Sequence, residues 1–332
     1  MGLRPGSSAA STVRLGVAAG AAGLALIVGI GRYAAQVTPP GTEAALTADE
    51  EQGALVPMED APPPPSGWDI SNLDHPRVDY WIGRFQTDKR EQFEGFLQRK
   101  GRFEPLIAAA LAEQQMPQDL LYLAMVESGF QTKAYSRAHA AGMWQFIRGT
   151  AVRYGLDINR AVDERNDPVK ATTAALRYLK DLHRMFGSWY LAAASYNTGE
   201  RRVARIMRRA MGRVRGTDGD YYRIWPHLPP ETRDYVPLMI AAARISKDPG
   251  RYGFDVKALD PWAFEQVVAR PATPLATLAR QAGTTVAAIR ALNPHLKLDR
   301  TRNDQPMSVR VPARPSAGGS GPGSSSETLA AD

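Results

Sequence analysis

Glu127 is the residue of this chain whose type and setting most favour chemistry. The stretch from Met116 to Gly129, MPQDLLYLAMVESG, predicts a helix that begins near Pro117 and is apolar around most of its circumference. A carboxylate buried in such a helix is costly to ionise, so its pKa rises, as a general acid near neutral pH requires. The residues leave another interpretation open, in which Glu127 lies at the helix end and reaches water or pairs with an arginine.

Other groups that commonly carry catalysis are scarce. None of the 332 residues is a cysteine, which excludes a thiol nucleophile, a disulfide framework, a zinc site built with cysteine and a lipoprotein anchor on an N-terminal cysteine. The five histidines are scattered, and no two have the spacing of metal ligands; they are His75, His139, His183, His227 and His295. We therefore expect neither a metal nor another cofactor.

The charge is moderately basic. There are 41 Lys and Arg against 34 Asp and Glu, a formal net charge of +7 that favours anionic surfaces without indicating a nucleic acid. The densest basic run has helical spacing and consists of Arg201, Arg202, Arg205, Arg208, Arg209, Arg213 and Arg215. It predicts a solvated helix face, with attraction to a polyanion such as a cell-wall polymer or a phospholipid surface as the alternative.

The N-terminal part predicts export. Residues 15–30 form an apolar run flanked by Arg14 and Arg32, short for a membrane span of about 20 residues but of the length of a signal-sequence core. We predict that residues 1–36 are a signal sequence or an anchor in the inner membrane, and that 37–67 are a Pro-rich linker. The remainder would then lie in the periplasm or cell envelope.

The elements that must position the candidate acid lie between residues 68 and 256. Aromatic and aliphatic residues recur there at helical intervals, and no convincing alternation typical of strands occurs before residue 260. Asp167-Pro168 predicts a helix start, Gly187 predicts its end, and Trp189 to Tyr196 predicts another buried helix. We therefore predict a mainly α domain over 68–256.

A smaller module and a tail follow. Residues 260–314 predict a strand, two helices and a second strand, an α+β module of βααβ order. Residues 315–332 are rich in Gly and Ser and predict a disordered tail.

Three short motifs carry a resemblance to a known family. They are Glu127-Ser128-Gly129-Phe130, then Ala141-Gly142-Met143-Trp144-Gln145-Phe146, and then Ser195-Tyr196-Asn197-Thr198-Gly199-Glu200. In this order they resemble the lysozyme-like lytic transglycosylases with an Slt-type catalytic domain. The segment Thr232–Pro237 and residues 163–203 look specifically like the membrane-bound murein transglycosylase D group, so the resemblance runs from about Trp68 to Phe254. It implies a lysozyme-like helical catalytic domain.

The resemblance implies roles for eight residues. Glu127 matches the family's single catalytic acid, and Ser128 matches the serine that helps to build the site around the sugar N-acetyl group. The others match the lining of the glycan groove (Gly142, Met143, Trp144, Gln145) and the residues that face the glutamate from a neighbouring helix (Tyr196, Asn197). Taken singly, each also fits a helix cap or a core position. Ser195 stands where alanine is usual, so a small residue is kept.

The C-terminal module resembles a degenerate LysM module, which binds peptidoglycan. Asn293-Pro294 and Val309-Arg310-Val311-Pro312 fit the LysM pattern, whereas Ala272-Thr273-Pro274 and Asn303-Asp304-Gln305 depart from it. A structural appendage to the catalytic domain is the alternative.

The function implied by the resemblance is that of a peptidoglycan lytic transglycosylase, a lyase. Such an enzyme cleaves the β-1,4 bond between N-acetylmuramic acid and N-acetylglucosamine in glycan strands and leaves a 1,6-anhydro ring. Glu127 would act first as acid and then as base, because the other carboxylate in these motifs, Glu200, falls beyond Gly199, which ends the helix. A muramidase of the same fold and a non-catalytic cell-wall-binding protein remain open as alternatives.

Overall fold

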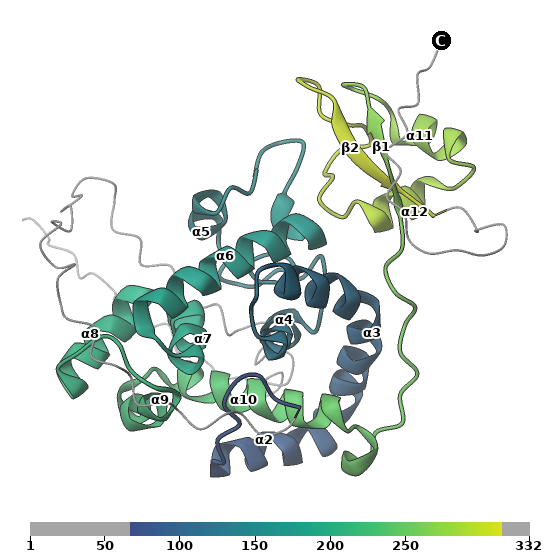
Figure 1. Ribbon diagram of the computed structural model, residues 1–332. Coiled ribbons are helices and arrows are strands. Elements are labelled where there is room, and N and C mark those ends of the chain that lie inside the picture. Colours follow the sequence, from purple (N-terminus) through teal and green to yellow (C-terminus); the bar gives the residue numbers. More distant parts are fainter. Residues whose placement is uncertain (1–66, 314–332) are drawn as a thin grey trace, which may run out of the picture.

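The computed structural model describes residues 67–313 of the chain (Figure 1). The expected signal sequence or anchor, the expected linker up to residue 66 and the expected tail from residue 315 lie outside this range. Within residues 67–313, no helix is long and apolar enough to cross a membrane.

The body of the molecule is helical. In chain order its elements are α2 (Pro76–Gln86), α3 (Arg90–Glu113), η2 (Gln118–Leu120), α4 (Leu121–Ser128), α5 (Arg148–Arg153), η3 (Glu164–Asn166), α6 (Pro168–Phe186), α7 (Trp189–Thr198), α8 (Glu200–Met211), α9 (Asp218–Ile224), η4 (Trp225–His227), α10 (Pro230–Lys247) and η5 (Gly250–Tyr252). Helix α4 lies in the middle of this body and packs against α3 and α10, while α7 packs against both α6 and α10 (Figure 1). The predicted mainly α fold class is confirmed.

The central helix α4 begins later than its sequence predicts. Pro117 precedes the 3-10 turn η2, and the α-helix begins only at Leu121. The cause is a cap from outside the segment, because the Asp69 carboxylate accepts hydrogen bonds from the backbone N–H groups of Gln118 and Asp119 and so fixes a tight turn. All eight residues of α4 are buried, as the apolar pattern predicts.

Gly129 ends α4 and allows α3 to pack closely against its end. Its φ of +58° is in the left-handed region that glycine adopts without strain. A Cβ at this position would lie 2.1 Å from the ring of Phe96 in α3. The turn after Ser128 therefore has a fixed course, which positions the residues that follow it.

The predicted ends of α6 are confirmed. The side chain of Asp167 accepts hydrogen bonds from the backbone N–H groups of Val169 and Lys170, with Pro168 at the first helical position. Gly187 closes the helix with a φ of +72°.

The C-terminal module has the predicted βααβ order. Strand β1 (Glu265–Ala269) pairs antiparallel with β2 (Met307–Val311), and α11 (Leu275–Gln281) and α12 (Val286–Leu292) lie between them in sequence. The module has a second hydrophobic core, which includes Leu275, Ile289 and Val309 and is joined by Val162 of the helical body. A small α+β module therefore stands beside the helical body (Figure 1).

A buried ion pair fastens this module to the helical body. Arg310 of β2 donates two hydrogen bonds, of 2.9 and 2.8 Å, to the carboxylate of Asp167, the N-cap of α6. Burial alone would raise the pKa of the Asp167 carboxyl, but the hydrogen bonds and charge of Arg310 hold it below its ordinary value. The backbone N–H of Asp163 also donates to the carbonyl of His295 at 2.9 Å. The module is thus held in one orientation on the helical body.

Candidate active site

The Glu127 carboxyl group lies in the interior, between α4 and α10. Its side chain is buried, and the hydroxyl of Tyr235 donates a hydrogen bond of 2.6 Å to its Oε1. Burial raises the pKa of Glu127 to about 8, opposed by the Tyr235 hydrogen bond and reinforced by the charge of Glu231. The group is therefore protonated at neutral pH, as the sequence predicts for a general acid.

Tyr235 is a site residue that the sequence did not single out. It lies in α10, is fully buried, and its pKa is raised well above the ordinary value by burial and by the charge of Glu127. The segment Thr232–Pro237 belongs to the family pattern, but it contains no spacing that relates it to Glu127. The resemblance of that segment to the family was the available sequence signal. The hydrogen bond between Tyr235 and Glu127 depends on how α10 packs against α4, which the sequence does not show.

Tyr196 lies within reach of the charge of Glu127. Burial and the charge of Glu127 raise the pKa of Tyr196 well above its ordinary value. Its hydroxyl donates a 2.7 Å hydrogen bond to the carbonyl of Trp144, and its ring lies 5.2 Å from that of Tyr178. Tyr196 therefore links α7 to the loop before α5 and forms part of the wall around the acid.

Asn197 is held by the start of α10. Its side-chain oxygen accepts a 2.7 Å hydrogen bond from the hydroxyl of Thr232, and both residues are buried. Because Tyr235 lies one helical turn after Thr232, the same helix orients Asn197 and contacts Glu127.

Gly142 gives the loop before α5 its close contact with the η3 turn. The loop closes on itself through mutual backbone hydrogen bonds between Ala141 and Phe146, of 3.0 and 3.1 Å. Gly142 has a φ of +81°, and a Cβ there would lie 1.7 Å from the carbonyl oxygen of Arg165. Only glycine fits at this point.

Gln145 presents an acceptor from the same loop. Its Nε2 donates a 2.7 Å hydrogen bond to the carbonyl of Gly142, and its backbone has a φ of +47°. Its Oε1 is buried and has no hydrogen-bond partner among residues 67–313. A buried acceptor of this kind is costly unless something donates to it, which marks Gln145 as a candidate ligand-binding residue.

Ser128 joins the first motif to the second. Its hydroxyl donates a 2.8 Å hydrogen bond to the carbonyl of Met143 and accepts one of 3.1 Å from the backbone N–H of Gln131. Met143 and Trp144 are buried, and the indole of Trp144 donates to Thr172 at 2.9 Å. These three predicted site residues thus shape the loop from within.

The nearby carboxylates differ in their surroundings. Glu200 contacts Arg153 at 3.0 Å and accepts a 3.0 Å hydrogen bond from Tyr178. Burial would raise the pKa of Glu200, but a hydrogen bond from the backbone together with these two contacts lowers it. Glu231, at the start of α10, is the second carboxylate whose charge acts on Glu127. The sequence identified Glu200 as the nearest one, and Glu231 was missed because it lies outside the three motifs.

The part of the chain that the structure describes contains no cluster of side chains that could bind a metal ion. No group of three or more His, Asp or Glu side chains there is arranged to hold an ion. His295 of the C-terminal module is buried, and its Nδ1 lies 3.1 Å from the carboxylate of Asp167, the N-cap of α6.

Comparison with known proteins adds an independent finding. Residues 104–215 match the family model of the transglycosylase SLT domain. Over 237 residues, 68% of this chain, the sequence is 36% identical to membrane-bound lytic murein transglycosylase D of Escherichia coli (strain K12) and of Escherichia coli O6:H1 (strain CFT073). The aligned part is 52% of each relative, so the chain spans about half the length of the curated relatives it matches. The segment matched by the family model contains Glu127, Gln145 and Tyr196 but ends before Tyr235.

Proposed function

We propose that this chain is a peptidoglycan lytic transglycosylase, because residues 104–215 match the transglycosylase SLT domain and the aligned relatives are named lytic murein transglycosylase D. The observation that carries the proposal is the Glu127 carboxyl group, buried, hydrogen-bonded by Tyr235 and with a pKa of about 8. Such a group holds a proton at neutral pH, and no cation within residues 67–313 pairs with Glu127 to keep it ionised. It has the property that glycosidic cleavage requires of an acid.

The first step is protonation of the leaving group. Glu127 donates its proton to the glycosidic oxygen between N-acetylmuramic acid and N-acetylglucosamine, and the bond from that oxygen to C1 breaks. The acetamido group of the muramic acid supports the developing positive charge at C1. The departing sugar leaves with a free 4-hydroxyl group.

The second step uses the carboxylate that the first step leaves behind. Glu127 accepts the proton of the C6 hydroxyl of the muramic acid, whose oxygen attacks C1 and closes the 1,6-anhydro ring. No water is consumed, and Glu127 ends the cycle protonated. The Tyr235 hydroxyl, which donates to Oε1, stabilises the transient carboxylate between the two steps.

Three further side chains are proposed to hold the substrate. The Oε1 of Gln145, a buried acceptor, accepts a hydrogen bond from the N–H of the acetamido group. Tyr196 and Asn197, held by Trp144 and Thr232 respectively, fix the opposite wall. Ser128, Gly142, Met143 and Trp144 give the loop its shape.

A muramidase is the second candidate, and Glu231 is the observation that favours it. Glycosidases that use water generally have a second carboxylate to act as base or nucleophile. The charge of Glu231 reaches Glu127, whereas Glu200 is neutralised by Arg153. A hydrolase would therefore use Glu231, and its products would retain one molecule of water.

The site of action proposed is the cell envelope. The relatives are named membrane-bound, and residues 1–36 have the pattern of an export signal or an inner-membrane anchor. Residues 260–314 are proposed to be a LysM-like module that adds affinity for glycan strands. We propose no nucleic acid partner and no cofactor.

Digestion of purified sacculi tests the proposal. The wild-type protein should release soluble muropeptides one water lighter than hydrolysis products, measured by mass spectrometry. Glu127→Gln keeps the shape and the acceptor for Tyr235 but cannot donate the proton, so release should fall by about 100-fold or more. Binding to sacculi without any release by the wild type would instead indicate a non-catalytic wall-binding protein.

A further inference from the structure

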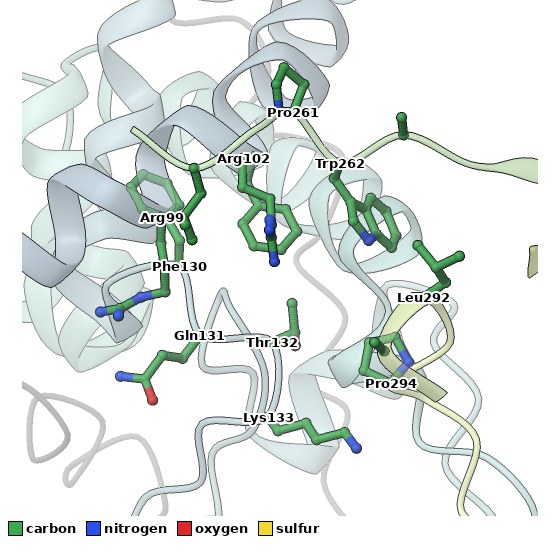
Figure 2. Close-up of a pocket in the computed structure, with 14 residues that line it drawn as sticks. Arg99, Arg102, Phe130, Gln131, Thr132, Lys133, Pro261, Trp262, Leu292 and Pro294 are labelled. Carbon is green, nitrogen blue, oxygen red and sulfur yellow. The ribbon is translucent and has the colours of Figure 1, made fainter. Parts of the chain in front are cut away.

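A cavity lies between the helical body and the C-terminal module. It has a volume of about 680 Å³, within the size range of small-molecule sites. Its wall combines the middle of α3, the turn after α4, the segment that connects to the module, and the end of α12 (Figure 2). The turn after α4, Phe130 to Lys133, begins three residues after Glu127.

The wall of this cavity is positively charged. It contains Arg99, Arg102 and Lys133, and none of its lining residues is an Asp or Glu. In Figure 2, Arg102 points into the opening from α3 and Lys133 lies at the opposite rim. No carboxylate within residues 67–313 forms an ion pair with any of these three side chains. Such a cluster favours an anion.

Arg99 connects the cavity to the helix that carries Glu127. Its Nε donates a 2.6 Å hydrogen bond to the carbonyl of Gly129, the C-cap of α4. The side chain is half-buried, and burial lowers its pKa from the ordinary value. The guanidinium of Arg99 therefore has a fixed position, and an anion bound beside it would stabilise its charged form.

The other side of the cavity is apolar. Trp262, Leu292 and Pro294 lie there (Figure 2). The cavity thus offers both positive charge and apolar surface. A ligand that fits both combines carboxylates with aliphatic groups, as a short peptide does.

The two sides are held in fixed relation. The backbone N–H groups of Leu259 and Trp262 donate to the carbonyls of Gln98 and Arg102, at 2.9 and 3.0 Å, so the connecting segment lies along α3. Gly101 permits this approach, because a Cβ there would lie 2.6 Å from that of Ala258. Together with the Arg310–Asp167 pair, these contacts preform the cavity.

We propose that this cavity binds the carboxylates of the peptide that the muramic acid of peptidoglycan carries. The inference rests on the proposed function, because it takes the same strand as the ligand. A muramic acid placed at Glu127 has its peptide attached beside the cleaved bond, and the turn from Phe130 to Lys133 leads from the acid to the cavity. The site would thus select strands that still bear their peptides.

Binding of a soluble fragment tests the inference without any cleavage. The probes are an N-acetylmuramoyl peptide with free carboxylates and the same peptide with its carboxylates amidated, titrated calorimetrically into the full chain. The free acid should bind at least about tenfold more tightly, the factor expected from one charge-assisted hydrogen bond. The variant Arg102→Ala/Lys133→Ala should bind the free acid no better than the amide.

A matched control removes the same two charges elsewhere. Arg177 and Lys180 are exposed on α6 and line no part of the cavity, so Arg177→Ala/Lys180→Ala should bind like the wild type. Equal affinity for acid and amide, or undiminished binding by the cavity variant, would overturn the inference. So would displacement of the peptide by inorganic phosphate at equal concentration, because it would indicate an unselective anion site.

These outcomes are separate from those that test the reaction. A protein that binds the free-acid peptide selectively but releases hydrolysed muropeptides would refute the transglycosylase chemistry alone. A protein that releases anhydro muropeptides but ignores the carboxylates of the peptide would refute the peptide site alone.

Discussion

The hydroxyl of Tyr235 donates a 2.6 Å hydrogen bond to Oε1 of Glu127, although 108 positions separate the two residues in the chain. Both side chains are buried, so either polar group would be costly to leave without a hydrogen-bond partner. The bond favours the ionised carboxylate and thereby lowers the pKa of Glu127, against the stronger effect of burial. Tyr235 therefore affects both proposed steps, proton donation by Glu127 and proton acceptance by its carboxylate.

Tyr235→Phe should change the rate and its pH dependence together. Loss of the hydrogen bond raises the pKa of Glu127 further, so the fall of activity at alkaline pH should move to higher pH. The carboxylate also loses an orienting partner, and kcat should fall by about 10- to 100-fold. A pH profile of muropeptide release measures both effects.

Glu231→Gln is a control that should shift the pKa of Glu127 in the direction opposite to Tyr235→Phe. The charge of Glu231 raises the pKa of Glu127, so its removal should shift the alkaline fall to lower pH. A shift in the same direction for both variants would contradict the electrostatic account of the site. Loss of all activity in Glu231→Gln would favour the muramidase interpretation.

Glu127→Gln should stabilise the protein in a way that depends on pH. The pKa of Glu127 is 4.5 in its ordinary state and about 8 in the fold, so the folded state holds an extra proton between these values and wild-type stability falls as pH rises through them. The variant has no such proton. Its gain in free energy of unfolding should be near zero below pH 4.5 and reach the order of a few kcal/mol above pH 8.

Chemical denaturation across this pH range measures that gain. Glu113→Gln, which removes an exposed glutamate at the end of α3, is the matched control and should change the free energy of unfolding by less than about 0.5 kcal/mol at any pH. A gain in Glu127→Gln that is the same at low and high pH would be inconsistent with a raised pKa.

Local patterns predicted more of this fold than of its site. The burial of Glu127 follows from the apolar neighbours on α4, and the ends of α6 follow from Asp167-Pro168 and Gly187, since these signals act within a few residues. The helical segment begins after Pro117, but its first turn, from Gln118 to Leu120, is a 3-10 turn capped by Asp69, about 50 residues away, and the α-helix begins only at Leu121. A contact between elements distant in sequence leaves no periodicity to detect.

In the site, too, residues within local motifs were predicted and contacts between distant elements were not. Gln145, Tyr196 and Asn197 were identified by resemblance, and the structure shows what holds each one. Tyr235 and Glu231 were missed, because their relation to Glu127 depends on how α10 packs against α4. Charge effects through space cannot be seen in a linear motif.

Gly142→Ala should be strongly destabilising. A Cβ would lie 1.7 Å from the carbonyl oxygen of Arg165, so the loop must move in addition to adopting an unfavourable φ of +81°. We expect a loss of about 3 kcal/mol or more in the free energy of unfolding, with reduced release of muropeptides.

Gly155→Ala separates the two causes. Gly155 has a φ of +86°, but no other atom lies within 4 Å of the position that a Cβ would take, so only the backbone strain of about 1 to 2 kcal/mol applies. Equal losses in the two variants would show that the contact with Arg165 does not matter.

Arg310→Met should loosen the C-terminal module by leaving the carboxylate of Asp167 buried without its cation. Removal of one partner of a buried ion pair costs about 3 to 5 kcal/mol. Adding Asp167→Asn, which keeps the cap of α6 but removes the charge, should restore part of the loss. Thermal unfolding and protease cleavage of the module give the two readouts; losses that simply add would argue against the pair.

The pH dependence of this pair has a definite sign. The pKa of Asp167 is lowered in the fold, so the stability it contributes is present above its ordinary value of 3.8 and is lost as pH falls through the lower folded value.

Digestion of sacculi in water labelled with heavy oxygen tests the central claim most directly. If Glu127 activates the C6 hydroxyl of the muramic acid, the new bond at C1 uses an oxygen already in the substrate, and the released muropeptides should carry no label. Incorporation of one labelled oxygen at C1 in the initial products would contradict the account, because it would show that water is the nucleophile.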